Sequence, residues 1–243
     1  MAISRWSWAV LNVLQLVFTL VWTAGWILLA LLVLLLTRSR RLPLRMAARC
    51  WAPGLLRGSG ARLVVRGVER VDWSRPQVLV ANHQSMIDIC ALFRAVPVPL
   101  QFLLKQELSK VPFVGLYARA MGMIFIDRGS AREASRRMHE AADLVRAGAT
   151  LCIFPEGTRS RDGDVLPFKS GAFQVALDAG ADVVPVAIEG SGKVLSLGGV
   201  FRVRPGTITL TFGTPLPSVD IADRQTLAQQ AREQVIALKR EAA

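Results

Sequence analysis

The feature that most constrains the fold of this chain is an apolar run close to its N-terminus. Positions 6–36 hold no charged side chain in 31 residues, and Asn12 and Gln15 are the only strongly polar ones. As a single helix at about 1.5 Å per residue the run would extend roughly 46 Å, whereas the hydrocarbon core of a bilayer is ~30 Å thick. We therefore expect either one tilted membrane helix or a helical pair that breaks at Gly25 and enters one leaflet.

Arginines are concentrated directly after this run. Eight fall in a 29-residue stretch without an acidic side chain: Arg38, Arg40, Arg41, Arg45, Arg49, Arg57, Arg62 and Arg66. In a chain of net charge +12, this cluster predicts contact with an anionic membrane surface, and it places the rest of the chain on the cytoplasmic side of the inner membrane. Residues 42–56 predict an amphipathic helix along that surface. Few aromatic residues are interleaved with the basic ones, so nucleic acid is not an expected partner.

The chain of 243 residues is long enough for one substantial domain with an appendage. We expect residues 1–58 to form a membrane anchor with its interfacial segment, and residues 59–243 to form the main domain. Cys50, Cys90 and Cys152 lie far apart, without a C-x-x-C pair or a Cys/His cluster. This spacing supports neither a disulfide framework nor a metal site.

Short β-prone runs alternate with helical patterns from Ala61 onward. The expected strands cover residues 63–68, 77–81, 100–104, 123–126, 150–154 and 183–188, and the clearest helices cover 131–146, 170–179 and 223–239. This alternation is typical of an α/β fold with a mainly parallel sheet flanked by helices. Near the C-terminal end, residues 200–204 and 207–212 predict an antiparallel hairpin across Pro205-Gly206.

A histidine follows one of these strands, at the point where a helix is expected to begin. His83 and Asp88 are five residues apart, about 140° round a helix, so they cannot share a helical face. If His83 lies in the turn and Asp88 in the first helical turn, the carboxylate can bind one ring nitrogen and leave the other free as a base. The alternative is that Ser85 and Asp88 form a helix-capping pair and His83 is an incidental loop residue.

Charged residues follow three further strands. In Phe154-Pro-Glu-Gly-Thr-Arg-Ser160, Gly157 and Thr158 can turn polar groups toward an anion beside the Arg159 guanidinium, as in a phosphate site. The alternative is an ordinary loop in which Glu156 and Arg159 form an exposed ion pair. Asp127-Arg128 and Lys105 also stand directly after strands, where α/β folds place their sites, although solvated charges are the commoner outcome.

Four segments together resemble a known family. Asn82-His-Gln-Ser-Met-Ile-Asp88, Gly122-x-x-Phe-Ile-Asp-Arg128, Phe154-Pro-Glu-Gly-Thr-Arg-Ser160 and Val184-Pro-Val186 are similar to the four ordered motifs of the glycerophospholipid acyltransferases. The resemblance is strongest to the bacterial 1-acyl-glycerol-3-phosphate acyltransferases, and it covers about residues 60–215. It implies that the main domain moves a fatty acyl group from an acyl thioester, carried by acyl carrier protein or coenzyme A, to the sn-2 hydroxyl of a lysophospholipid.

The resemblance also implies roles for individual residues. His83 and Asp88 would form the catalytic dyad, with no metal and no resident cofactor. Gly157, Thr158 and Arg159 would bind the acceptor phosphate, and we count Glu156, Lys105 and Arg128 with them as substrate-binding residues. Two other interpretations stay open: the same chemistry on another acceptor, such as glycerol-3-phosphate or a lyso-ornithine lipid, and a noncatalytic protein whose basic segment binds membranes.

Overall fold

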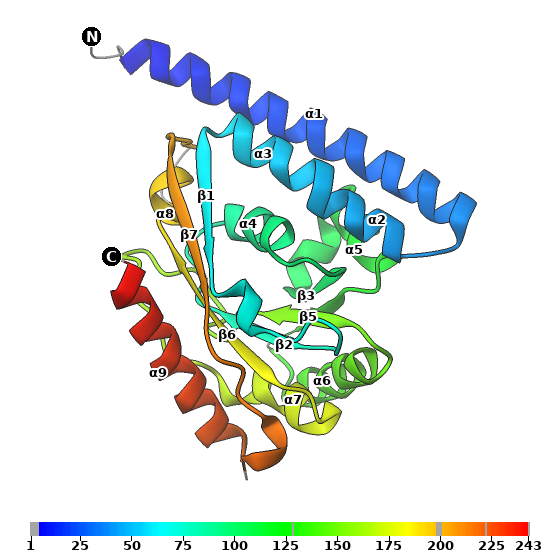
Figure 1. Cartoon of the computed structure of the whole chain (residues 1–243). Helices are drawn as coiled ribbons and strands as arrows, with labels where there is room; N and C mark the ends of the chain where they lie inside the picture. The colour runs from blue at the N-terminus through cyan, green and yellow to red at the C-terminus, as the bar shows by residue number, and fades with distance from the viewer. Residues whose placement is uncertain (1–4, 128, 198–200, 222, 243) are drawn as a thin grey trace.

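A seven-stranded sheet forms the centre of the computed structural model, which describes residues 5–127, 129–197, 201–221 and 223–242 (Figure 1). Its strands are β1 (Ala61–Arg66), β2 (Val78–Ala81), β3 (Leu100–Lys105), β4 (Ile124–Ile126), β5 (Thr150–Ile153), β6 (Val183–Glu189) and β7 (Gly206–Phe212). They are arranged in the order β1-β7-β6-β2-β5-β3-β4. The non-consecutive order shows that crossover connections join most neighbouring strands, as in α/β folds.

The sheet is mostly parallel, which confirms the predicted fold class. Strands β6, β2, β5, β3 and β4 pair in parallel, β7 pairs antiparallel with β6, and β1 pairs in parallel with β7. The predicted hairpin is wrong, because β7 lies between β1 and β6, where Ile208 and Leu210 are buried on pairing. Val203 makes only an isolated bridge to Leu195, and Val200 lies outside the described residues.

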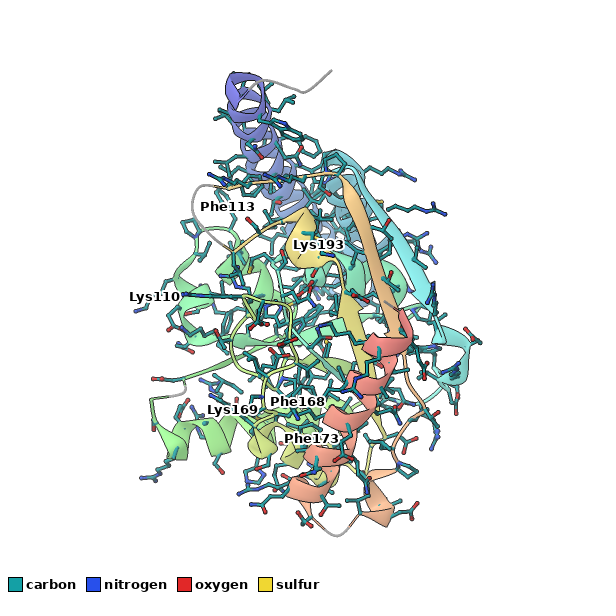
Figure 2. All side chains as sticks on the ribbon, turned by 90° about the vertical axis from the view of Figure 1, so that its left-hand side faces the viewer. Lys110, Phe113, Phe168, Lys169, Phe173 and Lys193 are labelled. Carbon is teal, nitrogen blue, oxygen red and sulfur yellow. The ribbon has the colours of Figure 1, made fainter. Side chains whose placement is uncertain are left out.

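Helices cover both faces of the sheet (Figure 1). They are α4 (Ile87–Ala95), α5 (Val114–Ala120), α6 (Ala131–Arg146), α7 (Gln174–Ala179), α8 (Ser191–Val194) and α9 (Arg224–Ala242), with short helical turns η2 (Val68–Arg70), η3 (Gln106–Lys110), η4 (Ser170–Phe173) and η5 (Ser218–Asp220). Helix α6 has the bounds predicted for it. On the face covered by α6, α7 and α9, Phe168 stacks on the fully buried Phe173 with ring centroids 6.2 Å apart, and both rings lie near α9 in Figure 2.

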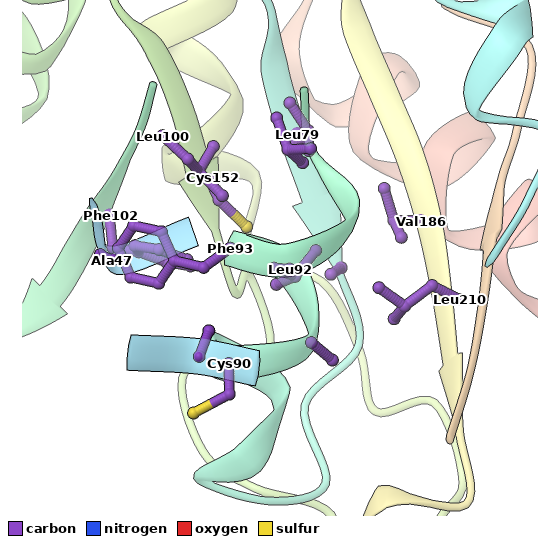
Figure 3. Packing of buried hydrophobic residues seen from close by; sticks show 14 of the residues in the cluster. Ala47, Leu79, Cys90, Leu92, Phe93, Leu100, Phe102, Cys152, Val186 and Leu210 are labelled. Carbon is purple, nitrogen blue, oxygen red and sulfur yellow. The ribbon is translucent and has the colours of Figure 1, made fainter. Parts of the chain in front are cut away.

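Strand β2 shows why the sheet has two apolar faces. All four of its residues are buried, and successive side chains point to opposite faces of a strand. Leu79 therefore packs in the cluster that contains α4, and Val80 in the cluster that contains α6, α7 and α9. In Figure 3, Leu92 and Phe93 of α4 lie among sheet residues of the first cluster, and the Phe93 and Phe102 ring centroids are 5.0 Å apart.

The N-terminal segment forms a pair of helices across one end of the molecule (Figure 1). Helix α1 (Arg5–Thr37) is followed by α2 (Arg41–Met46), a π-helical turn η1 (Ala47–Trp51) and α3 (Ala52–Gly58), which run back along α1. The Trp22 ring covers Gly54 so closely that a Cβ atom there would meet it at 2.4 Å. The indole of Trp22 donates to the Trp51 carbonyl at 3.1 Å, and the Trp51 indole donates to Thr23 Oγ1 at 3.1 Å.

Of the two arrangements left open for residues 6–36, the structure has the single helix, since α1 continues through Gly25 without a break. A glycine inside a helix costs only about 1 kcal/mol, and the packing of Trp22, Ile27 and Ala30 on either side of it holds the helix together. Among the described residues, the segment Trp8–Thr37 is the one helix long and apolar enough to cross a membrane. The boundary predicted at residue 58 falls between α3 and β1 and stays a prediction.

Candidate active site

The polar segments singled out in the sequence meet at one edge of the sheet. His83 follows the end of β2, and Glu156 follows the end of β5, which pairs with β2 in parallel. Because neighbouring parallel strands end at the same edge, their following loops come together there. The backbone N–H of Ser160 donates to the His83 carbonyl at 2.8 Å, which joins the two loops directly.

His83 and Asp88 are in direct contact. His83 lies in the loop before α4, Asp88 is the second residue of that helix, and His83 Nδ1 is 2.7 Å from Asp88 Oδ2. Among the described residues, nothing bonds to the other ring nitrogen, Nε2. The imidazole side chain is 14% exposed and that of Asp88 is fully buried. This arrangement fixes the tautomer of the ring and leaves Nε2 able to accept a proton.

The same carboxylate also organises the loop around His83. Asp88 Oδ2 accepts the backbone N–H groups of Gln84 at 2.8 Å and Ser85 at 2.9 Å. The contact with Ser85 is half of a capping box. The same carboxylate therefore makes the capping contact before helix α4 and orients the imidazole of His83, so the capping pair and the dyad are both present. The Ser85 hydroxyl donates to the Leu195 carbonyl at 2.7 Å, which ties this loop to the segment after α8.

Two amide side chains anchor the loop to strand β6. Asn82 Nδ2 donates to the Ile188 carbonyl at 2.9 Å, and Asn82 Oδ1 accepts the Ile188 N–H at 2.7 Å. Gln84 Nε2 donates to the same carbonyl at 3.0 Å. Both side chains are buried, where an unpaired amide would cost about 1–3 kcal/mol. These bonds therefore hold His83 rigidly between β2 and β6.

Glu156 lies beneath the histidine loop. Its side chain is buried, and Oε1 accepts the backbone N–H of His83 at 3.3 Å, while Oε2 has no partner among the described residues. Burial raises the pKa of this carboxyl group to about 8, and the negative charge of Asp88 adds to the effect. The structure thus places Glu156 behind the dyad, in contact with protein backbone, and it does not form the exposed ion pair with Arg159 that was the alternative.

Phe154 links the histidine to the apolar interior. Its ring stacks on that of His83 with centroids 4.0 Å apart and an interplanar angle of 19°. On its other side it stacks with Phe102, at 6.3 Å between centroids. The contact with Phe154 restricts the rotation of the imidazole, in addition to its bond to Asp88.

The predicted phosphate-binding residues form a turn beside this loop. Gly157 adopts a φ of +76°, a left-handed conformation that glycine takes without strain, and its N–H donates to the Phe154 carbonyl at 3.1 Å. Thr158 is exposed and Arg159 is half-buried. Within the described part of the chain, no protein group bonds to the Arg159 guanidinium, so its five N–H donors are available to an anion.

The other two predicted binding residues lie after strands β3 and β4. Lys105, the last residue of β3, pairs with Glu107 at 2.7 Å, and both side chains are exposed. No contact joins Lys105 to the loops of His83 or Glu156 in the described part of the structure. Arg128 lies outside the described residues, next to Asp127, whose Oδ1 accepts the N–H of Gly129 at 2.8 Å.

An apolar pocket of about 270 Å³ lies next to the segment that carries the dyad, because Met86, Ile87 and Ile89 line it. Its walls come from α1 and the α2–α3 segment on one side, and from α4, β3 and α5 on the other, with Trp26, Trp51, Met86, Phe93, Phe102 and Tyr117 among its largest side chains. Phe102 belongs both to this wall and to the stack that ends on His83. The pocket is large enough for a flexible hydrocarbon chain and has almost no polar lining.

The C-terminal helix fastens the loop that follows Ser160. From α9, Arg232 donates to the carbonyls of Leu166 at 3.1 Å and Val165 at 2.9 Å, and Lys239 donates to the carbonyl of Gly163. The Gly163 N–H in turn donates to the Ser160 hydroxyl at 3.0 Å, and the Ser160 N–H donates to the His83 carbonyl. A chain of polar contacts therefore connects α9 with the backbone of His83.

Sequence reasoning missed the supporting groups of this site. Phe154 and Asn82 stand within the motifs, but no local pattern shows that one stacks on His83 and the other binds β6. Arg232 is 149 positions from His83, and the pocket combines residues from α1 to β3 and beyond. Only the tertiary structure brings these segments together.

Comparison with known protein families identifies a match over about half of the chain. The family model described as "Acyltransferase" matches residues 62–189, which include the loops of His83, Lys105 and Glu156.

The similar proteins reported next are all named as acyltransferases that act on 1-acyl-sn-glycerol-3-phosphate. A Chlamydomonas reinhardtii protein named 1-acyl-sn-glycerol-3-phosphate acyltransferase is 33% identical over 235 residues, which are 96% of this chain and 68% of that protein. Human 1-acyl-sn-glycerol-3-phosphate acyltransferase alpha is 38% identical over 130 residues, 53% of this chain and 46% of its own length. The crystal structure of PlsC, the 1-acyl-sn-glycerophosphate acyltransferase of Thermotoga maritima, aligns with a TM-score of 0.83 and 28% identity, covering 96% of this chain and 94% of that one.

Proposed function

Since the chain belongs to the acyltransferase family, we propose that it moves a fatty acyl group from an acyl thioester to the sn-2 hydroxyl of 1-acyl-glycerol-3-phosphate, giving phosphatidic acid. The observation that carries this proposal is the His83–Asp88 contact of 2.7 Å, next to an apolar pocket that Met86 and Ile87 of the same segment line. The names of the relatives support the choice of acceptor.

His83 acts as the general base in this reaction. An alcohol is a poor nucleophile at neutral pH, and a positioned base accelerates its attack by about 10²- to 10⁴-fold. As the acceptor oxygen bonds to the thioester carbonyl carbon, its proton passes to Nε2 of His83. The carbon–sulfur bond then breaks, and the imidazolium of His83 donates that proton to the leaving thiolate. Asp88 stabilises the imidazolium between these two steps.

Arg159 holds the phosphate of the acceptor. The guanidinium is half-buried and free of protein partners in the described part of the chain, and it follows Gly157 and Thr158 in a turn that leaves polar groups exposed. Charge-assisted bonds to a phosphate are about twice as strong as neutral ones. Fixing the phosphate places the acceptor hydroxyl beside His83 and replaces a bimolecular encounter with a positioned one. Lys105 and Arg128 are proposed to assist.

The apolar pocket binds an acyl chain. The stack from His83 through Phe154 to Phe102 connects the base to the pocket wall, so a chain in the pocket carries its carbonyl group near the imidazole. Burying each methylene group is worth ~0.8 kcal/mol. The thioester and the alcohol react directly, so the proposed reaction requires neither an acyl-enzyme nor a resident cofactor. The donor is acyl carrier protein or coenzyme A thioester.

Helix α1 anchors the protein in one leaflet of the inner membrane, with the main domain on the cytoplasmic side. The main domain contacts α1 along most of its length: Asn12 accepts the Val203 N–H at 2.7 Å, and Leu34 packs on the core cluster around α4. A span perpendicular to the bilayer would draw charged surface of the domain into hydrocarbon. Lying obliquely in one leaflet, α1 exposes its outer apolar row to lipid and holds the pocket at the interface.

The proposal is tested with the purified full-length protein in vesicles. It is supplied with lysophosphatidate, lyso-ornithine lipid or glycerol-3-phosphate, each with acyl carrier protein and coenzyme A thioesters, and the products are identified by lipid mass spectrometry. We expect phosphatidic acid from lysophosphatidate and a higher acceptor KM for Arg159→Ala. Acylation of only the lyso-ornithine lipid would contradict the proposed acceptor, and no acyl transfer to any of them would contradict the reaction.

A further inference from the structure

With one exception, the large apolar side chains exposed on the described part of the main domain come from neighbouring segments. Outside the N-terminal helices, the described residues of this kind are Met86 at 42%, Val111 at 42%, Phe113 at 46%, Leu116 at 51% and Val219 at 76% exposed. Val219 stands alone in η5. The other four come from the loop after His83, from the segment that joins η3 to α5, and from α5 itself. This set, Met86, Val111, Phe113 and Leu116, is called the rim patch below.

The rim patch borders the apolar pocket and helix α1. Met86 itself lines the pocket, and so do Leu108 of η3 and Val114 of α5, on either side of Val111 and Phe113. The opposite wall consists of α1 residues, and α5 also contacts α1 directly. The patch therefore continues the exposed apolar row of α1, which includes Leu28, Leu32 and Leu35.

The backbone of the rim patch is strained at Phe113. Phe113 has a φ of +61°, a conformation that residues other than glycine rarely adopt. Gly115 packs so closely behind it that a Cβ atom would meet the Ser109 carbonyl oxygen at 2.2 Å. Holding an aromatic residue in this conformation costs free energy, and exposing its ring to water does not offset that cost. The exposed ring therefore indicates contact with an apolar partner.

The charges around the patch indicate what that partner is. Lys110 is exposed directly before it, and Phe113 lies nearer than Lys110 to the end of the molecule that carries α1 (Figure 2). Apolar side chains next to the membrane helix, with a lysine on the side away from it, match the hydrocarbon and headgroup layers of an anionic leaflet. The chain's net charge of +12 favours the same surface.

We propose that the rim patch is a second membrane-inserting surface, which enters the leaflet that holds α1 and opens the acyl pocket to the lipid phase. This inference rests on the membrane association and acyl binding proposed above. An acyl chain then passes between bilayer and pocket sideways, without crossing water. Phe113 and Leu116 fix the angle at which the main domain meets the membrane, which α1 alone leaves free to rotate about its axis.

The first test measures depth in the bilayer and requires no turnover. Phe113→Cys is made in a Cys50→Ser background, since Cys90 and Cys152 are buried, and is labelled with the fluorophore NBD in the full-length protein. In vesicles of phosphatidylglycerol and phosphatidylethanolamine, we expect a blue-shifted emission that lipids with doxyl groups on the acyl chain quench. The matched control is Val219→Cys, which should stay unquenched. Val219 is exposed in η5, and the segment between β7 and α9 to which η5 belongs turns at the end of the fold away from α1 (Figure 1).

Two results would overturn the proposal. One is an emission at position 113 as water-like as that at position 219. The other is a blue shift that doxyl lipids do not quench, which would indicate a second copy of the chain on this surface. Because neither readout depends on catalysis, a failure of the proposed reaction would leave this test intact.

The second test separates insertion from folding. Phe113→Gly removes the strain and the ring together, so we expect an unchanged or higher Tm. We also expect a several-fold slower acyl transfer on vesicles but equal rates on short-chain substrates dissolved in water. A lower Tm with full activity on vesicles would show that the ring serves the fold, and would refute the proposal.

Discussion

Replacing Glu156 by glutamine tests whether a neutral carboxyl group supports the histidine loop. Glu156 is 4% exposed, Oε1 accepts the His83 N–H at 3.3 Å, and burial raises the pKa of the group to about 8. At pH 7 the folded protein therefore holds this side chain protonated. Glutamine has nearly the same shape, carries no charge, and keeps an oxygen that can accept the same N–H.

The expected effect follows from the two pKa values. In the unfolded chain the group titrates near 4.5, and in the folded protein near 8. Between these values the folded state binds the extra proton, so the contribution of Glu156 to stability is fully present below pH 4.5 and is lost as the pH rises through 8. The two pKa values differ by about 3.5 units, and each unit corresponds to ~1.4 kcal/mol. The loss in the free energy of unfolding is therefore about 5 kcal/mol at most.

Thermal unfolding of the two proteins in the same detergent, at several pH values from 5 to 9, measures this difference. Every other titrating group is shared, so subtracting the two curves isolates residue 156. We expect the Tm of the natural protein to fall relative to that of Glu156→Gln as the pH rises, with the gap widest above pH 8. Parallel curves would show that Glu156 is ionised in the folded protein and would refute the reasoning.

Three further predictions concern the groups around the dyad. Asp88→Asn should lower kcat by about 10²- to 10⁴-fold at an unchanged vesicle affinity, because the amide fixes the wrong tautomer of the imidazole; steady-state kinetics checks this, and a less than threefold change would contradict it. Arg232→Gln should lower kcat roughly tenfold through the loop it fastens, whereas Arg240→Gln, an exposed charge on the same helix, should not; equal rates for both variants would contradict the connection. Ala30→Phe places a ring in the acyl pocket and should shift the preference toward shorter acyl donors in competition assays; an unaltered product profile would argue against acyl binding there.

The fold could be predicted from the sequence wherever local pattern decides it. The apolar runs at residues 77–81, 150–154 and 183–188 correspond to the buried strands β2, β5 and β6, because strands covered on both faces are apolar throughout. Pairing could not be predicted in the same way. Residues 207–212 have the same β character in a hairpin as between β1 and β6, and the choice depends on burial against distant strands.

The site was predictable to the same extent. The turn position of His83 and the helical position of Asp88 allowed the contact that the structure has. Glu156 was grouped with the substrate-binding residues because it stands in their motif, yet its side chain turns to the backbone of His83. Sequence order cannot show which way a loop side chain points, and it gives no sign of Arg232 or of the pocket beneath α1.

The most direct measurement of the central claim uses the only two histidines of the chain. His83 meets Asp88 at the sheet edge, whereas His139 is exposed on α6 and pairs with Asp178 at 2.8 Å. In vesicles with lysophosphatidate and an acyl thioester, His83→Ala should lower the rate of phosphatidic acid formation by at least about 10²-fold, while His139→Ala keeps the full rate and both proteins bind the membrane. Normal turnover by His83→Ala would contradict its assignment as the base.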